Sequence, residues 1–295
     1  MKYLIIALAI ISGNFDTPSQ IAELEKTAQN DRFNYQVRLE LAEIYLDQDN
    51  YSAAQRYLCE TDTIFAGLDS SLLQGRLLYL WGLYYDKQDN IPKAIEKYQA
   101  ALEQDSTIAK AWRQMGYIHD IFSDGAQMLY CFEHALLFTD DSAGVYYDMG
   151  IAYDYLDSLQ RAIESYHDAL DINPMIFEAY LNLGVDLSSL GYPDSANYYF
   201  QKADSAGLNG PELYYNLGMI AFDGGQIDQS LDNFMHVLAL DPDYTPAKYM
   251  LGNVYEAVGD SGMAKLYYQE FVDTAPMLYL DNINEVKEKL SKYNK

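Results

Sequence analysis

The chain is poor in positive charge. Only 19 of its 295 residues are lysine or arginine, against 44 aspartates and glutamates, which gives a formal net charge of −25. A protein that binds nucleic acid needs a basic face to displace the counterions of the phosphates, and the sequence offers none. We therefore expect no nucleic-acid partner. The acidity favours a partner that is basic or polar and neutral, or it reflects a saline habitat.

Cysteine is also scarce, and long apolar runs are missing. Cys59 and Cys131 are the only two cysteines, so the chain is not built on a disulfide framework. The apolar run Tyr3–Ile11 is shorter than the roughly 20 residues that a membrane-spanning helix needs. We therefore expect no stable membrane span.

The same run has the features of a leader. It follows a lysine and precedes small residues, as in a short signal peptide. We expect residues 1–13 to be a signal peptide or an apolar leader, and the protein to be exported to the bacterial periplasm or cell envelope. The alternative is an apolar N-terminal helix on a cytoplasmic protein.

Motifs of catalysis and cofactor binding are absent from the sequence. There is no glycine-rich phosphate loop, no calcium loop and no Gly-x-Ser-x-Gly elbow. Cys131 and His134 lie three residues apart and offer two metal ligands at most. We expect no cofactor and no metal, and we expect that the protein is not an enzyme.

What the sequence has instead is a period of 34 residues. It places six glycines in register: Gly82, Gly116, Gly150, Gly184, Gly218 and Gly252. The residue twelve later is small in most copies, and the residue sixteen later is always aromatic: Tyr98, Phe132, Tyr166, Phe200, Phe234 and Tyr268. Self-similarity at a fixed period is typical of a stacked repeat array.

The pattern resembles that of the tetratricopeptide repeat family. The residues that carry it best are Tyr146, Met149, Gly150, Tyr153, Ala162, Tyr166, Ala169 and Pro174. The resemblance implies an all-α fold, a right-handed superhelical solenoid of helix-turn-helix units with capping helices. Small residues at the glycine and twelve positions later let the two helices of a unit approach closely. Burial of the aromatics offsets the roughly 1 kcal/mol that a glycine costs inside a helix.

Seven units cover residues 34–276, and a helix caps each end. The first unit is degenerate, because Ala42 takes the place of the glycine, and about six residues are inserted after it. The N-terminal cap covers 17–32, with Thr17 as its N-cap, and the C-terminal cap covers 278–294. The units are 34–66, 75–108, 109–142, 143–176, 177–210, 211–244 and 245–276.

In this family the first helix of each unit lines a concave groove, where peptides bind. By helical geometry, the residues that face this groove include those three positions before, one position after and four positions after each repeat glycine. The resulting candidates are Tyr79, Asp86, Arg113, Tyr117, Asp120, Tyr147, Ile151, Asp154, Asn182, Tyr215, Asn216, Tyr249 and Asn253. A row of tyrosines beside a row of acids favours a segment that bears lysine or arginine. The alternative is that the tyrosines pack between repeats and the acids form a solvated face.

Two family features are weak or missing in this groove. Asn182 and Asn216 resemble two rungs of the asparagine ladder by which some members hold a peptide backbone. The clamp for a C-terminal carboxylate needs several groove cations, and only Arg113 and Lys110 are available. We expect no such clamp.

The sequence thus predicts a non-catalytic scaffold that binds a protein or an extended peptide in its groove. Substitution of Tyr147, Asp154 and Tyr215 should then weaken partner capture without unfolding the chain. The alternative is an accessory subunit that recruits substrate to a separate enzyme or to envelope assembly machinery. The oligomeric state is left open.

Overall fold

The computed structural model describes residues 18–66 and 71–293. The predicted leader, Thr17 and part of the predicted insertion lie outside these residues. The chain divides into two compact units, and the division falls after Leu156. We call them unit 1 and unit 2 and treat each by itself. Over the described residues all regular structure is helical.

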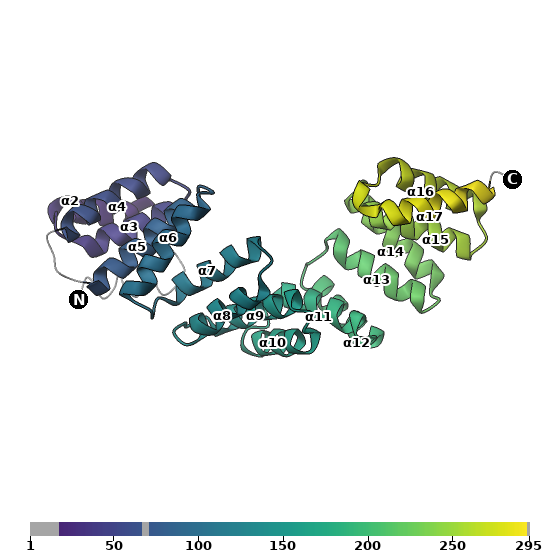
Figure 1. The fold of residues 1–295 in the computed structure, drawn as a ribbon, viewed down its shortest axis with the longest axis horizontal. Helices are drawn as coiled ribbons and strands as arrows, with labels where there is room; N and C mark the ends of the chain where they lie inside the picture. Colours follow the sequence, from purple (N-terminus) through teal and green to yellow (C-terminus); the bar gives the residue numbers. More distant parts are fainter. Residues whose placement is uncertain (1–17, 67–70, 294–295) are drawn as a thin grey trace. The chain divides into compact units, whose positions relative to one another are not determined.

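Over its described residues, unit 1 consists of a single helix, three antiparallel helix pairs and one further helix, α9. In each pair the first helix is joined to the second by a tight turn, and each pair packs against the next one along the chain (Figure 1). The helices are α2 (Pro18–Asn30), α3 (Tyr35–Asp47), α4 (Tyr51–Phe65), α5 (Ser71–Asp86), α6 (Ile91–Gln104), α7 (Ala109–Ile121), α8 (Gly125–Leu136) and α9 (Ser142–Tyr155).

Unit 2 continues the same alternation and ends in a single helix. A short 3₁₀ helix, η1 (Met277–Tyr279), leads into this last helix. The helices are α10 (Leu159–Ile172), α11 (Phe177–Ser189), α12 (Pro193–Ser205), α13 (Pro211–Asp223), α14 (Ile227–Leu240), α15 (Thr245–Ala257), α16 (Ser261–Thr274) and α17 (Leu280–Tyr293).

Five repeat glycines lie beneath the aromatic rings of the second helices: Gly82, Gly116, Gly184, Gly218 and Gly252. A Cβ atom at Gly82 would come within 2.4 Å of the Tyr98 ring, and one at Gly252 within 2.3 Å of the Tyr268 ring. The residue twelve positions later also reaches the glycine, because Ser230 Oγ donates a hydrogen bond to the Gly218 carbonyl. The aromatic ring sixteen positions after the glycine occupies the space that a Cβ atom would need, so this position requires glycine. This explains why glycine and aromatic recur together.

The turn between the two helices of a pair repeats one backbone feature. The residue seven positions after the repeat glycine, or after Ala42 in the first repeat, has a positive φ angle. These residues are Asp49, Asp89, Ser123, Asp157, Gly191, Gly225 and Gly259. In unit 1 the side chains of Asn50, Asn90 and Asp124 then cap the second helix. This left-handed conformation costs a non-glycine residue about 1–2 kcal/mol.

The two single helices close the apolar ends of the array. Near the start, the buried Arg38 on α3 donates from Nη2 to the carbonyl oxygen of Ala28 at the end of α2, over 2.8 Å. At the other end α17 buries Ile283, Val286 and Leu290 against the last pair. Such caps keep the apolar faces of terminal repeats out of water.

Candidate functional site

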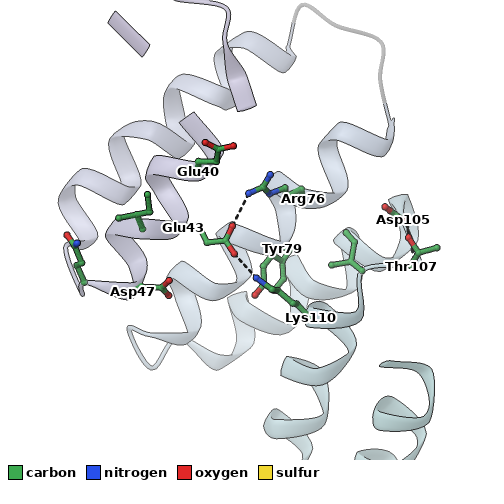
Figure 2. Close-up of a pocket in the computed structure, with 11 residues that line it drawn as sticks. Glu40, Glu43, Asp47, Arg76, Tyr79, Asp105, Thr107 and Lys110 are labelled. Carbon is green, nitrogen blue, oxygen red and sulfur yellow. Dashed lines mark hydrogen bonds and ion pairs between the residues drawn. The ribbon is translucent and has the colours of Figure 1, made fainter. Parts of the chain in front are cut away.

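A groove runs along the first helices of unit 1. Its deepest part is a cavity of about 790 Å³ between α3, α5 and the start of α7 (Figure 2). Its polar lining comes mainly from α3 on one side and from α5 and α7 on the other. The lining residues are Glu40, Glu43, Ile44, Asp47, Gln48, Arg76, Tyr79, Asp105, Thr107, Ile108 and Lys110.

A second cavity of about 400 Å³ adjoins the first and extends it along α7. The two share Glu43, Asp47, Tyr79 and Lys110, so we treat them as one feature, the unit-1 groove. The second cavity adds residues from α5 and α7: Leu83, Lys87, Arg113, Gln114 and Tyr117. Three of the residues predicted from the sequence, Tyr79, Arg113 and Tyr117, thus line this groove.

Glu43 ties the walls of the groove together. Its carboxylate lies 2.9 Å from Arg76 Nη2 on α5 and 2.7 Å from Lys110 Nζ on α7 (Figure 2). Burial by itself would raise the pKa of Glu43, but Lys110 and Arg76 outweigh it and lower the pKa below its usual value. Both cations of the first cavity are therefore paired with one carboxylate of the protein itself.

Three further carboxylates, two in the lining of the groove and one beside it on α5, have no such partner. No lysine or arginine nitrogen of the described residues forms an ion pair with Glu40, Asp47 or Asp86. Burial raises the pKa of all three, more than the nearby cations lower it. A desolvated carboxylate without a cation is stabilised when a cation arrives. These carboxylates would therefore be stabilised by a cation that binds beside them.

Tyr79 lies at the centre of this charge. It is only 6% exposed, and its ring packs 6.0 Å from that of Tyr98 on α6. Burial first, and then the charges of Glu43 and Asp47, raise the pKa of Tyr79; Asp86 adds to this. Tyr98 in turn donates from its hydroxyl to Asp86 Oδ2 over 3.2 Å.

On α7 the predicted groove residues are held by a buried acid. Asp148 on α9 accepts hydrogen bonds from Arg113 Nε and from Tyr117 Oη, the latter over 2.9 Å. Arg113 Nη1 also pairs with Asp141 at 2.9 Å. The side chains of Arg113 and Tyr117 thus line the groove but are fixed by the neighbouring pair, and Asp120 on the same helix accepts a hydrogen bond from Tyr155.

The remaining candidate residues of unit 1 lie on α9. Tyr147, Ile151 and Asp154 are each half-buried, and Ile151 packs against the core around Phe132 and Met149. None of the three lines either cavity of the unit-1 groove. Their part in binding stays a prediction.

In unit 2 the predicted tyrosines pack on other rings. Tyr215 lies 5.7 Å from Phe234 and 5.6 Å from Tyr244 between ring centres. Tyr249 lies 5.3 Å from Phe271 and donates from its hydroxyl toward the Glu285 carboxylate. These contacts favour the packing interpretation for Tyr215 and Tyr249.

The two predicted asparagine rungs are engaged inside unit 2. Asn182 donates from Nδ2 to the hydroxyl of Tyr166 over 3.2 Å, and Asn216 donates to the carbonyl oxygen of Glu212 over 2.9 Å. An amide must release these bonds before it can hold a peptide backbone.

At the end of unit 2 a lysine of the chain itself binds to residues on the first and second helices of the last pair. Lys289 Nζ on α17 lies 3.0 Å from each of three oxygens: Asn253 Oδ1, Tyr268 Oη and Glu256 Oε2. Burial would raise the pKa of Glu256, but hydrogen bonds from Lys289, Tyr268 and Tyr293 outweigh it and lower the pKa. We call Asn253, Glu256 and Tyr268 the Lys289 cradle.

Three stretches of the chain match one known sequence family. The model of the tetratricopeptide repeat matches residues 143–174, 211–244 and 245–276, and the fold around them is a run of stacked helix pairs. The chain contains tetratricopeptide repeats. The repeats that form the unit-1 groove lie outside the residues that the family model matches.

Known relatives of this repeat protein are distant. It is 20% identical over 229 residues to BBSome complex member BBS4 of Bos taurus, which covers 78% of this chain and 43% of that protein. The chain thus spans less than half the length of that relative. PilW, described as a type IV pilus biogenesis factor, superposes with a TM-score of 0.62 at 18% identity, over 72% of this chain and 97% of PilW.

A third likeness is to YrrB, described as a tetratricopeptide repeat protein with an unusual peptide-binding site. Its TM-score is 0.51 at 24% identity, over 62% of this chain and 96% of YrrB. At these identities the likenesses show the fold alone. No helix of the described residues of this repeat protein is long and apolar enough to cross a membrane.

The acidic wall of the groove was missed from the sequence. Glu40, Glu43 and Asp47 belong to the degenerate first pair, where Ala42 replaces the glycine. The rule of one position after the glycine, applied to Ala42, would have returned Glu43. Arg76 and Lys110 are also 34 residues apart, six before Gly82 and Gly116, so this position carries a repeated signal.

Proposed function

We propose that this protein is a non-catalytic scaffold that binds an extended segment of a partner protein in the unit-1 groove. The observation that carries the proposal is the groove itself. It runs across three successive first helices, is large enough for several side chains, and combines an aromatic floor with charged walls. Such a surface suits a chain segment, which offers side chains at regular intervals, better than a compact small molecule.

The charge of the lining supports a basic segment. In the first cavity Glu40, Glu43, Asp47 and Asp105 face only two cations, Arg76 and Lys110, and both cations are paired with Glu43. A segment that carries lysine or arginine would neutralise what remains, and the net charge of the whole chain would speed its approach.

Gln114→Trp tests the groove without a change of charge. Gln114 lines the second cavity on α7, and an indole there would fill much of it. Partners captured from the native extract by the full-length protein, and quantified by mass spectrometry, should be lost from this variant. Gln99→Trp is the matched control, because it fills a cavity lined by α6, α7 and α8 instead of the groove.

The controls give the test its meaning. Both variants should keep the helical circular dichroism and the unfolding midpoint of the parent. Equal capture by the parent and both variants would rule out the unit-1 groove as the binding surface. Co-purification of one enzyme through the groove would favour the accessory-subunit role.

We further propose that the protein works in the bacterial periplasm or cell envelope. The support is the leader-like composition of residues 1–13. N-terminal sequencing of the protein from its native cells tests it, since an uncut Met1 in a cytoplasmic fraction would contradict it.

A further inference from the structure

The Lys289 cradle has a repeat-equivalent counterpart in the unit-1 groove. Tyr268 and Glu256 lie sixteen and four positions after Gly252, and Tyr98 and Asp86 stand at the same steps after Gly82. In both places the tyrosine hydroxyl donates to the carboxylate, over 2.8 Å in the cradle and 3.2 Å in the groove. The two pairs therefore present the same acceptor in the same local frame.

Only one of the two pairs holds a cation. In the cradle the Lys289 ammonium bonds to both members of the pair and to Asn253. At Asp86 no lysine or arginine of the described residues forms an ion pair, and Leu83 replaces Asn253. Leu83 and Lys87, which flank Asp86 on α5, both line the second cavity, and Asp86 is half-buried beside them without being part of that lining.

Asp47 supplies a second carboxylate from the opposite wall. It lines both cavities, and its charge, like that of Asp86, raises the pKa of Tyr79. The charges of the two acids thus act on one buried phenol from two helices, α3 and α5. Within unit 1 they are the acids beside Tyr79 that lack an ion pair, because Glu43 is held by Arg76 and Lys110.

We propose that the unit-1 groove holds a lysine side chain of the bound segment against Tyr79, between Asp47 and Asp86, as the cradle in unit 2 holds Lys289. This inference rests on the proposed function and names the side chain that the groove selects. The chain itself supplies the precedent, because the same tyrosine–carboxylate pair already holds an ammonium in unit 2.

The geometry favours lysine over arginine. An ammonium can donate to separate oxygens in three directions, as Lys289 does, whereas a guanidinium binds best to two oxygens of one carboxylate. At Asp86 one oxygen already accepts from Tyr98. A compact ammonium therefore fits between two acids on different helices better than a planar fork.

Labelled peptide pools test the subsite on the full-length protein. Each pool holds nine-residue peptides with amidated C-termini, randomised flanks and one fixed central residue: lysine, arginine, acetyl-lysine or glutamate. Fluorescence anisotropy should show the lysine pool binding about tenfold more tightly than the acetyl-lysine pool, since acetylation removes the charge. Arginine should bind more weakly than lysine, and glutamate most weakly.

The double variant D47N/D86N should abolish the preference for lysine over acetyl-lysine. Asparagine keeps the shape of each side chain and still accepts a hydrogen bond from Tyr98, so folding should be retained. E133Q/D168N is the matched control, because it removes two exposed carboxylates on the second helices α8 and α10 and should keep the preference.

Each outcome decides something different. A preference that persists in D47N/D86N, or is lost equally in E133Q/D168N, would overturn the subsite. Equal binding of the lysine and acetyl-lysine pools, with both blocked by Gln114→Trp, would overturn the subsite and leave the proposed function standing. Equal binding of the lysine and arginine pools would overturn the assignment of lysine. Binding of no pool would count against both proposals.

Discussion

Units 1 and 2 share one repeat but use the inner faces of their first helices differently. Six positions before the repeat glycine, unit 1 carries Arg76 and Lys110, whereas unit 2 carries Glu178 and Glu212. In unit 1 the two cations clasp Glu43 beside an open cavity. In unit 2 the predicted groove residues pack on neighbouring aromatic rings or form hydrogen bonds within the unit.

The difference separates two levels of constraint in a repeat protein. Positions that touch within the repeat, such as each glycine and the ring above it, are alike in both units. Positions that face away from this contact vary in charge and in partner. Packing is thus common to both units, and the recognition that we propose is local to unit 1.

The shared packing predicts the largest effect. Gly82→Ala in unit 1 and Gly252→Ala in unit 2 should each lower the free energy of unfolding by about 2–3 kcal/mol, because the new Cβ would overlap an aromatic ring. Urea unfolding measures the loss. Gly210→Ala is the control, since only the flexible end of Glu212 is near, and it should change stability by less than about 0.5 kcal/mol. Equal tolerance at Gly82 and Gly210 would contradict this packing.

The ionic contacts should separate the units next. Lys289→Met should cost about 1 kcal/mol, because it removes charge-assisted bonds to three partly buried acceptors. Lys110→Met should cost less than about 0.5 kcal/mol, since its ammonium is largely exposed and Arg76 still holds Glu43. Thermal unfolding of the two variants measures the contrast, and a larger loss for Lys110→Met would reverse the comparison.

Acid should erase the effect at Lys289. The pKa of Glu256 is lowered in the folded protein, so its contribution to stability is present above the unfolded pKa of about 4.5 and is lost as the pH falls through the folded value. The parent should therefore be more stable than Glu256→Gln at pH 7, and the two should converge below pH 4.5. A stability difference that is constant from pH 7 to pH 3 would refute this linkage.

Turn chemistry should give the smallest effect. Ser123 in unit 1 has a positive φ that glycine adopts without strain. Ser123→Gly should therefore raise the free energy of unfolding by about 0.5 kcal/mol, with a small rise in the unfolding midpoint. The reverse change in unit 2, Gly259→Ala, should cost about 1 kcal/mol, because nothing but its φ of 82° opposes a side chain there. Calorimetry of both variants tests whether the turns are interchangeable.

The fold was predictable because the repeat encodes it many times over. Each copy of glycine, small residue and aromatic reports the same contact, so the loss of one, as at Ala42, does not hide the rest. The helix pairs and the all-α class follow from that redundancy.

The groove was less predictable, because the residues that form its contacts do not recur in every repeat. Asp148 fixes Arg113 and Tyr117 from the position two before Gly150, which is also the position of Asn182 and Asn216, but its spacing does not tell that it reaches the preceding first helix. Lys289 belongs to α17, which has no glycine to set its register. Such cross-helix partners depend on how neighbouring repeats meet, and spacing along one chain does not report that.

The clasp at Glu43 also has a mechanical side. A stack in which each repeat touches only its neighbours behaves like a spring, and its stiffness depends on whatever braces it across more than one step. Glu43 on α3 reaches past α5 to Lys110 on α7, and so braces three successive first helices. Salt weakens exposed ion pairs, since the screening length is about 8 Å at physiological ionic strength. Higher ionic strength should therefore make it easier for the three helices to move apart when a segment binds in this groove.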